Sequence, residues 1–334
     1  MRTRLLTNFL VILGLVSLLG GCRYLPHPRV RERFHNPFPQ LKLVAVVPFY
    51  NQSDSPTLDA DAVTNAYYEA IQSVPGFEVL PVTATQQAIN SYALMHGMPR
   101  DGQDFQALAK HLDVEAIVVG SVTDFDPFYP PRMAITTHWY AANEGFHPIP
   151  PGYGMPWGTK AEERIETWIV DETEFELARK QLATQTPIEP MAPNSQTSFD
   201  GNLGTYLESG PNAMTASTND EFDMVGSGLP EDWPNPTDLI PDPPQPLPPQ
   251  LTVSHDPVLV HTRLYKGDDP YFTSKLADYV ETGDDARGSG WQGYLKRSDD
   301  FIRFCCHLHF TEMLAARGGK RESEFIVRFP LSRY

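Results

Sequence analysis

The pattern of apolar residues predicts two fully buried strands in the first half of the chain. Residues 41–47 (LKLVAVV) and 116–122 (AIVVGSV) are short, rich in β-branched side chains and almost free of polar ones. Strands covered on both faces have this pattern, whereas strands with one wet face alternate apolar and polar residues. Apolar residues at helical spacing predict helices between them at about 59–74, 84–95 and 104–112, and a short strand at 77–82.

The rest of the same domain comes from residues 133–140 and from the last quarter of the chain. Residues 133–140 (MAITTHWY) and 257–265 (PVLVHTRLY) read as two further strands. We expect them to pair antiparallel, because neither half alone has enough elements to cover a sheet of apolar strands. Residues 41–140 and 256–334 would then form one α/β domain with a mixed sheet. The second part should also hold helices at about 270–279 and 300–316 and a strand at 324–329.

The intervening segment, 141–255, has a different composition. It holds 18 of the 42 acidic residues but only 4 of the 26 basic ones, so it carries −14 of the net charge of −16. We expect residues 187–251, which are polar and rich in proline, to be disordered. One helix is predicted over about 161–182, with these apolar residues on one side: Ile165, Trp168, Ile169, Phe175, Ala178 and Leu182. The overall negative charge argues against nucleic acid as a partner.

The amino terminus carries an export signal. Arg2 and Arg4 precede an apolar run at 9–19 that is too short to span a bilayer as a helix. The run ends in Leu19-Gly20-Gly21-Cys22, which resembles the lipobox of bacterial lipoproteins. The resemblance implies a signal peptide over 1–21, cleavage between Gly21 and Cys22, and lipid on Cys22. We expect a polar tether over 22–40. Because Arg23, not Asp, follows the cysteine, the resemblance favours the outer membrane, facing the periplasm.

The sharpest cluster of reactive side chains is Cys305-Cys306-His307-Leu308-His309. Cys305 and His309 are four residues apart and would share one face of a helix. Structural zinc sites need four ligands and catalytic ones three, so Cys305, Cys306 and His309 are weak metal candidates only. Core-facing cysteines are the preferred interpretation, and a redox role or a vicinal disulfide stays open. We expect no cofactor.

No sequence motif points to catalysis. The chain has no G-x-S-x-G elbow, P-loop or H-E-x-x-H. The glycine-rich residues 152–158 follow no strand and contain Pro156, so they are interpreted as a loop. Arg132 and Trp139 could line a partner surface, but a solvated charge and a core aromatic are favoured. We therefore do not expect an enzyme.

Several stretches resemble the periplasmic TolB amino-terminal and CsgG-like lipoprotein domains. These are 43–56 (LVAVVPFYNQSDSP), 74–79 (VPGFEV), 112–122 (LDVEAIVVGSV) and 268–279, which resembles the helix after the last strands of such proteins. The resemblance covers about 41–140 and 256–316. Members usually join the two strands that follow the one corresponding to 116–122 by a tight hairpin, whereas here more than a hundred residues lie between Tyr140 and Val258.

The resemblance implies an anchored, non-catalytic binding, scaffolding or assembly module of the cell envelope. An alternative is a subunit of an oligomeric CsgG-like secretion assembly, which would make this chain a homo-oligomer. The insert, however, lacks the alternating pattern of transmembrane strands. A third alternative, an envelope hydrolase, has no motif in its favour. The expected partners are the membrane, through Cys22, and an envelope protein that the sequence does not name.

Overall fold

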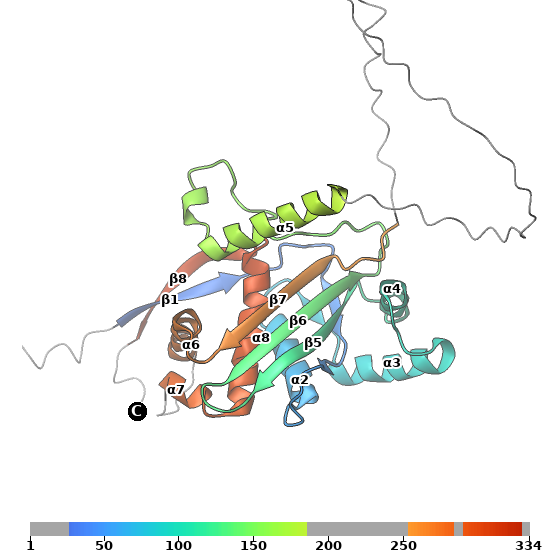
Figure 1. Ribbon diagram of the computed structural model, residues 1–334, viewed down its shortest axis with the longest axis horizontal. Helices are drawn as coiled ribbons and strands as arrows, with labels where there is room; N and C mark the ends of the chain where they lie inside the picture. The colour runs from blue at the N-terminus through green and yellow to red at the C-terminus, as the bar shows by residue number, and fades with distance from the viewer. Residues whose placement is uncertain (1–26, 186–252, 284–289, 329–334) are drawn as a thin grey trace, which may run out of the picture. The chain divides into compact units, whose positions relative to one another are not determined.

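The computed structural model describes residues 27–185, 253–283 and 290–328. Within them, six strands form a mixed sheet with the order β4–β2–β5–β6–β7, and β3 pairs beside β5 (Figure 1). The parallel pairs involve β2, β3, β4 and β5, and the antiparallel pairs are β5–β6 and β6–β7. The expected α/β class is therefore confirmed. The strands are β2 (Leu43–Val46), β3 (Tyr50–Asn51), β4 (Glu78–Val79), β5 (Ala116–Asp126), β6 (Arg132–Ala141) and β7 (Leu259–Lys266).

The predicted antiparallel pairing across the insert is confirmed. Strand β6 pairs with β7 from Arg132 opposite Lys266 to Trp139 opposite Leu259. The described residues before Gln185 and after the insert belong to one compact unit. The segment 141–255 thus interrupts a single sheet instead of joining two domains.

Helices cover most of both faces of this sheet. On one face, α2 (Ala60–Gln72) and α8 (Ser298–Ala315) contact each other and the strands, with Tyr67 and Phe310 among the buried aromatics. Helices α6 (Pro270–Thr282) and α7 (Gly290–Tyr294) pack beside α8. On the other face, α3 (Val82–His96) and α4 (Gly102–His111) cover β2 and the beginning of β5. The expected helices near these positions are confirmed, and α7 is an additional short helix.

A second, two-stranded sheet corrects the expected tether. β1 (His27–Phe34) pairs antiparallel with β8 (Lys320–Arg328), so the tether predicted over 22–40 is wrong from His27 onward. The residues that follow β1 also belong to the folded domain, because Phe38 and Leu41 are buried in its core. The physical reason is that β8, almost three hundred residues away in the chain, supplies the hydrogen-bonding partner that β1 lacks locally.

The amphipathic helix expected at 161–182 is shifted and only partly packed. A short 3₁₀ turn (Glu162–Arg164) precedes α5 (Thr167–Gln185). Ile169 is buried and Ile165 and Trp168 pack beside it, but Phe175 and Leu182 are 70% and 65% exposed. The first part of α5 therefore lies on the domain, while the apolar residues further along it are not covered.

Three expectations lie outside the described residues: the signal peptide over 1–21, the lipid site at Cys22, and the disorder of 187–251. In the part that the structure does describe, none of the helices combines the length and the apolar character needed to cross a bilayer.

Candidate functional site

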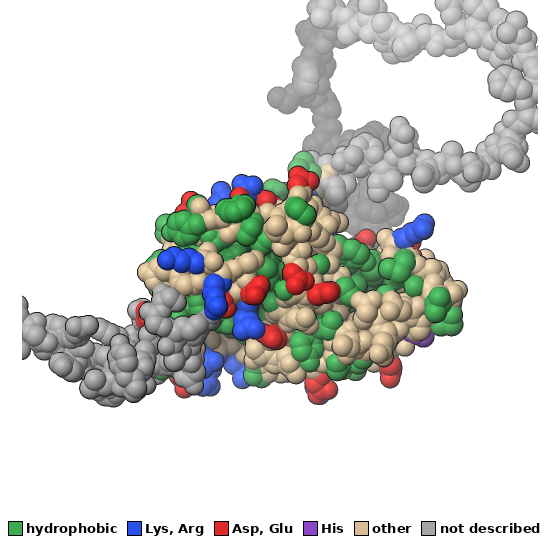
Figure 2. Space-filling view, turned by 90° about the horizontal axis from the view of Figure 1, so that it is seen from below, with side chains coloured by type: hydrophobic (Ala, Val, Ile, Leu, Met, Phe, Trp, Pro, Cys, Tyr) green, Lys and Arg blue, Asp and Glu red, His purple; other side chains and the backbone are tan. Residues whose placement is uncertain are grey.

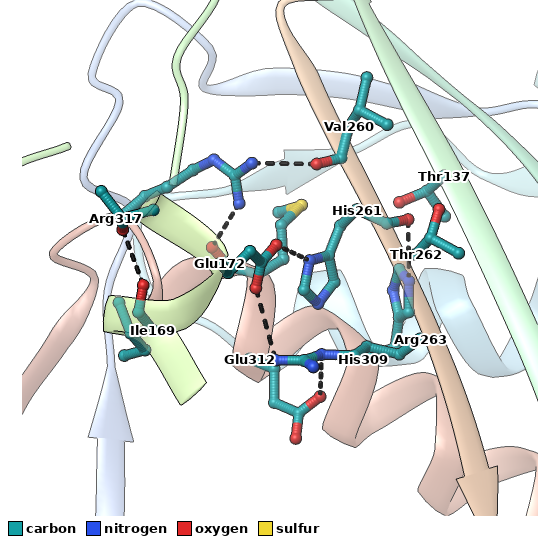
Figure 3. Close-up of polar contacts among 12 residues, drawn as sticks. Thr137, Ile169, Glu172, Val260, His261, Thr262, Arg263, His309, Glu312 and Arg317 are labelled. Atoms are coloured by element: carbon teal, nitrogen blue, oxygen red, sulfur yellow. Dashed lines mark hydrogen bonds and ion pairs between the residues drawn. The ribbon is translucent and has the colours of Figure 1, made fainter. Parts of the chain in front are cut away.

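A cluster of buried and partly buried polar side chains lies where α5, β7 and α8 meet (Figure 3). α5 contributes Glu172, β7 contributes His261 and Arg263, and α8 contributes His309 and Glu312. Buried polar groups require partners, because an unpaired one costs about 1–3 kcal/mol. Their contacts decide whether the cluster can do chemistry.

His309 is fixed in one tautomer by its two neighbours. Its Nε2 lies 3.3 Å from the backbone oxygen of His261, which can only accept, so Nε2 carries the hydrogen. Its Nδ1 lies 3.2 Å from the Tyr67 hydroxyl, which then donates. Burial, followed by the charges near it, lowers the pKa of His309 well below its usual range. This imidazole is therefore neutral and already engaged on both nitrogens.

His261 is also buried and neutral. Its ring centroid lies 4.7 Å from that of His309. The Glu172 Oε1 atom is 3.4 Å from His261 Nδ1, but the arrangement lacks hydrogen-bond geometry, and neither ring nitrogen has a hydrogen-bond partner among the described residues. Burial, and then the positive charges of Arg317 and Arg263, lower the pKa of His261 well below its usual range.

Arg263 connects the carboxylates of α5 and α8. One of its terminal nitrogens donates to Glu172 Oε2 at 3.4 Å, and its Nε lies 3.6 Å from Glu312 Oε2. Its guanidinium carbon is 4.5 Å from the ring centroid of Trp168, a cation–π arrangement. Glu312 also accepts a 2.7 Å hydrogen bond from the Tyr265 hydroxyl. Burial raises the pKa of Glu312 despite these partners.

Arg317, just after α8, is almost fully buried, and its hydrogen bonds within the described residues go to backbone oxygens. Its guanidinium donates to the carbonyls of Ile149 at 2.9 Å, Met313 at 3.1 Å and Val260 at 3.0 Å. Burial lowers its pKa to about 10, so it keeps its charge at neutral pH. It joins three segments: the loop after β6, α8, and β7.

The three weak metal candidates point to different partners. Cys306 lies against the backbone oxygen of Val63, with its sulfur 3.8 Å away. His309 faces Tyr67 and β7, as described above. Cys305 is buried, and both thiols are free. Burial raises the pKa of both cysteines, which keeps them protonated. In the described residues no three potential ligands converge on one point.

These contacts make the cluster a structural connection between α5, β7 and α8. Its histidines are neutral, and its charged groups are paired with one another or with the backbone. His261, Arg263, Glu312 and Arg317 could not be singled out from the sequence, because they come together only when α8 packs on β7. Of the two residues considered from the sequence for a partner surface, Trp139 is fully buried, and Arg132 is half exposed and paired with Asp124 at 3.2 Å.

A more open surface lies on the sheet face beyond α3 and α4. Here the outward side chains of β7, among them Val260 and Leu264, are 41% and 50% exposed. Beside them a hollow of about 470 Å³ opens along β5 and β6. Ser121, Thr123, Thr136 and His138 line its floor, and Tyr50, Gln52, Pro99 and Arg100 form its rim.

The end of α3 beside this hollow is apolar and exposed. Leu94, Met95 and Met98 are 90%, 63% and 57% exposed, and Pro99 and Arg100 of the hollow follow directly. Figure 2 shows hydrophobic side chains on the projecting end of α3, on the right of that view. We call Leu94, Met95 and Met98 the α3 patch. Clustered exposed apolar side chains of this kind mark interaction surfaces.

A larger hollow, of about 960 Å³, lies at the opposite ends of β2 and β5. Residues 37–41 and 145–149 form much of its wall, and Tyr153 lies at its edge. Of its polar residues, Glu115 already has partners, because its carboxylate accepts hydrogen bonds from the backbone of Lys42 and Leu43. Nothing in its lining points to a particular ligand.

Comparison with known proteins gives no family. No family model and no curated protein matches this chain. Among solved structures, the LpoB C-terminal domain from Salmonella enterica is 12% identical, covers 30% of this chain and 73% of its own, and gives a TM-score of 0.25. Lipoprotein GNA1162 from Neisseria meningitidis is 15% identical, with coverages of 30% and 69% and a TM-score of 0.22. The PelC dodecamer from Paraburkholderia phytofirmans is 13% identical, with coverages of 35% and 71% and a TM-score of 0.20. At these values the likenesses carry no conclusion about function.

Proposed function

We propose that this chain is a lipid-anchored envelope lipoprotein that binds or scaffolds a protein partner and catalyses no reaction. The anchor is Cys22 and the partner surface is the α3 patch with the adjoining hollow. The fold would be of the TolB amino-terminal or CsgG-like kind, as the sequence resemblance implies, and the site of action the periplasmic side of the outer membrane.

The observation that carries the binding role is the exposure of the α3 patch. Leaving Leu94 almost entirely in water forfeits its burial, which is worth about 1.5–3 kcal/mol. Two methionines beside it add flexible apolar side chains that adapt to different partners. A partner that covers these three side chains would recover that free energy.

The polar cluster supports a non-catalytic role. Its two histidines are neutral and sealed in the core, and the adjacent thiols stay protonated. Catalytic acids, bases and nucleophiles need access to a substrate and a pKa near the working pH.

The test is co-purification of the intact lipoprotein in detergent, followed by mass spectrometry of its neighbours. Leu94→Asp with Met98→Asp should remove a partner that the parent retains. Leu177→Asp, which also changes an exposed apolar residue, is the matched control. An unchanged set of partners in the double variant would contradict the proposal. A large ring of identical subunits in the same preparation would instead favour the alternative, a secretion assembly.

A further inference from the structure

The β1–β8 ribbon has two chemically different faces. On its inner face, Glu32 Oε1 accepts hydrogen bonds from Lys275 of α6 and from Lys320, both at 2.9 Å. Phe34, two residues on, packs against the core. Because successive side chains of a strand point to opposite sides, Arg31 and Arg33 belong to the other face of β1, which we call the outer face, and both are exposed.

The outer face is basic. The register puts Glu324 opposite Arg31 and Arg321 opposite Arg33. Arg33 forms an ion pair with Glu324, and both remain about half exposed. Arg31 and Arg321 are exposed, and no carboxylate in the described part of the chain forms an ion pair with either. Among the side chains that the structure describes on this face, three arginines and one glutamate leave a net positive surface, on a chain whose overall charge is −16.

The position of this ribbon along the chain restricts where it can lie. Five peptide units separate Cys22 from His27, where β1 begins. At full extension they span roughly 17 Å, at about 3.3–3.6 Å per residue. A lipid on Cys22 therefore holds the beginning of the ribbon within that distance of the membrane, whereas a tether reaching residue 40 would have left the domain far freer.

We propose that the outer face of the β1–β8 ribbon lies on anionic lipid headgroups and fixes the orientation of the domain on its membrane. This rests on the proposed lipidation of Cys22, which brings the ribbon to the surface. Basic residues close to an anionic leaflet are attracted to it, and such a patch commonly acts as the second signal beside a lipid chain. An acidic protein is the alternative occupant of the same charge, and the choice of lipid follows from the short distance to the anchor.

The ribbon can be tested without the lipid. The protein that begins at residue 22, with Cys22→Ser, is mixed with vesicles of phosphatidylcholine, either pure or with phosphatidylglycerol as about one third of the lipid. Sedimentation should show binding to the anionic vesicles only, and added salt should weaken it. Arg31→Gln and Arg321→Gln should each reduce the partition coefficient roughly fivefold, as expected from about 1 kcal/mol per basic residue.

Two further variants separate this effect from damage to the fold. Glu324→Gln removes the carboxylate that forms an ion pair with Arg33 and should raise binding roughly fivefold, which an unfolded ribbon would not do. Lys160→Gln removes an exposed positive charge elsewhere and should leave binding unchanged. Equal binding to both kinds of vesicle, or no response to Arg31→Gln and Glu324→Gln, would overturn the proposal. Because Cys22 is absent throughout, this result is independent of whether the cysteine is lipidated.

Discussion

The hydroxyl oxygens of Thr136 and Thr262 lie 3.1 Å apart, although 126 residues separate them in the chain. They face each other across β6 and β7. This pair of strands joins the two sequence halves, and α8 then packs on both strands. The domain is complete only when residues from both sides of the insert are present.

Neither half should therefore fold alone. Residues 22–185 lack β7, α8 and β8, and residues 253–334 lack the rest of the sheet. Expressed separately, each should show no cooperative unfolding, because each would leave a large apolar face in water. Mixed together, they should regain a cooperative transition by circular dichroism. Cooperative unfolding of either piece by itself would show that the two halves are separate domains.

The insert should be dispensable for stability. Replacing residues 187–251 with about 20 residues of Gly and Ser changes the loop-closure free energy by only about 1 kcal/mol. We expect the melting temperature to change by less than about 5 °C. The parent chain measured in the same buffer is the reference, and a loss of cooperative melting would mean that the insert is part of the core.

The main sheet could be predicted because its strands carry strong local signals. Ala45, Ile117 and Val118 lie in apolar runs and are fully buried, as those runs indicate. β1 could not be recognised in the same way. Its sequence, HPRVRERF, is charged and contains proline, and its partner β8 lies almost three hundred residues away. Only a contact between the chain's two ends makes it a strand.

The polar cluster between β7 and α8 could not be predicted from the sequence for a related reason. His261 follows the alternation of β7, and His309 follows the helical spacing of α8, so each fits its own element as a core position. Their ring centroids lie 4.7 Å apart only because β7 packs on α8. At Phe175 of α5, in contrast, the sequence pattern predicted burial that the structure does not show. This side chain lies on the predicted apolar side of the helix, but no described element covers it.

Arg317 should be among the most important residues for stability. Arg317→Met keeps much of the volume but leaves the carbonyls of Ile149, Met313 and Val260 without their donor. Each unpaired buried group costs about 1–3 kcal/mol, so we expect a loss of at least about 3 kcal/mol in urea unfolding. Arg321→Met, on the exposed ribbon, should cost less than about 1 kcal/mol. Equal effects of the two changes would refute the structural role given to Arg317.

Tyr67→Phe tests the hydrogen bond to His309. The change removes only the hydroxyl, and it leaves His309 Nδ1 buried without a donor. We expect a destabilisation of about 1–3 kcal/mol in chemical denaturation. Tyr153→Phe, at a half-exposed position, is the control and should have almost no effect. A Tyr67→Phe protein as stable as the parent would mean that this bond contributes nothing.

The buried histidines should make stability fall in mild acid. Burial depresses the pKa values of His261 and His309, so the unfolded chain binds protons that the folded chain does not. Their contribution is complete above the unfolded pKa of about 6.5 and is lost as the pH falls below it, by up to about 1.4 kcal/mol per pH unit for each histidine. Glu312 acts in the opposite direction, because its raised pKa favours the folded state at lower pH.

The comparison that isolates the histidines is between the parent and His309→Gln. Unfolding free energies measured at about pH 7.5 and pH 5.5 should differ less in the variant than in the parent, because one titrating group has been removed. The same slope in His309→Gln as in the parent would contradict the assignment.

The most direct test of the account as a whole is the mass of the mature protein extracted from membranes. We expect a chain that begins at Cys22 and carries the additional mass of a lipid on that residue. The Cys22→Ser variant should keep residues 1–21 and carry no lipid. A mature chain that begins at another residue, or a Cys22 with an unmodified thiol, would contradict the claim that this protein is a lipid-anchored module of the cell envelope.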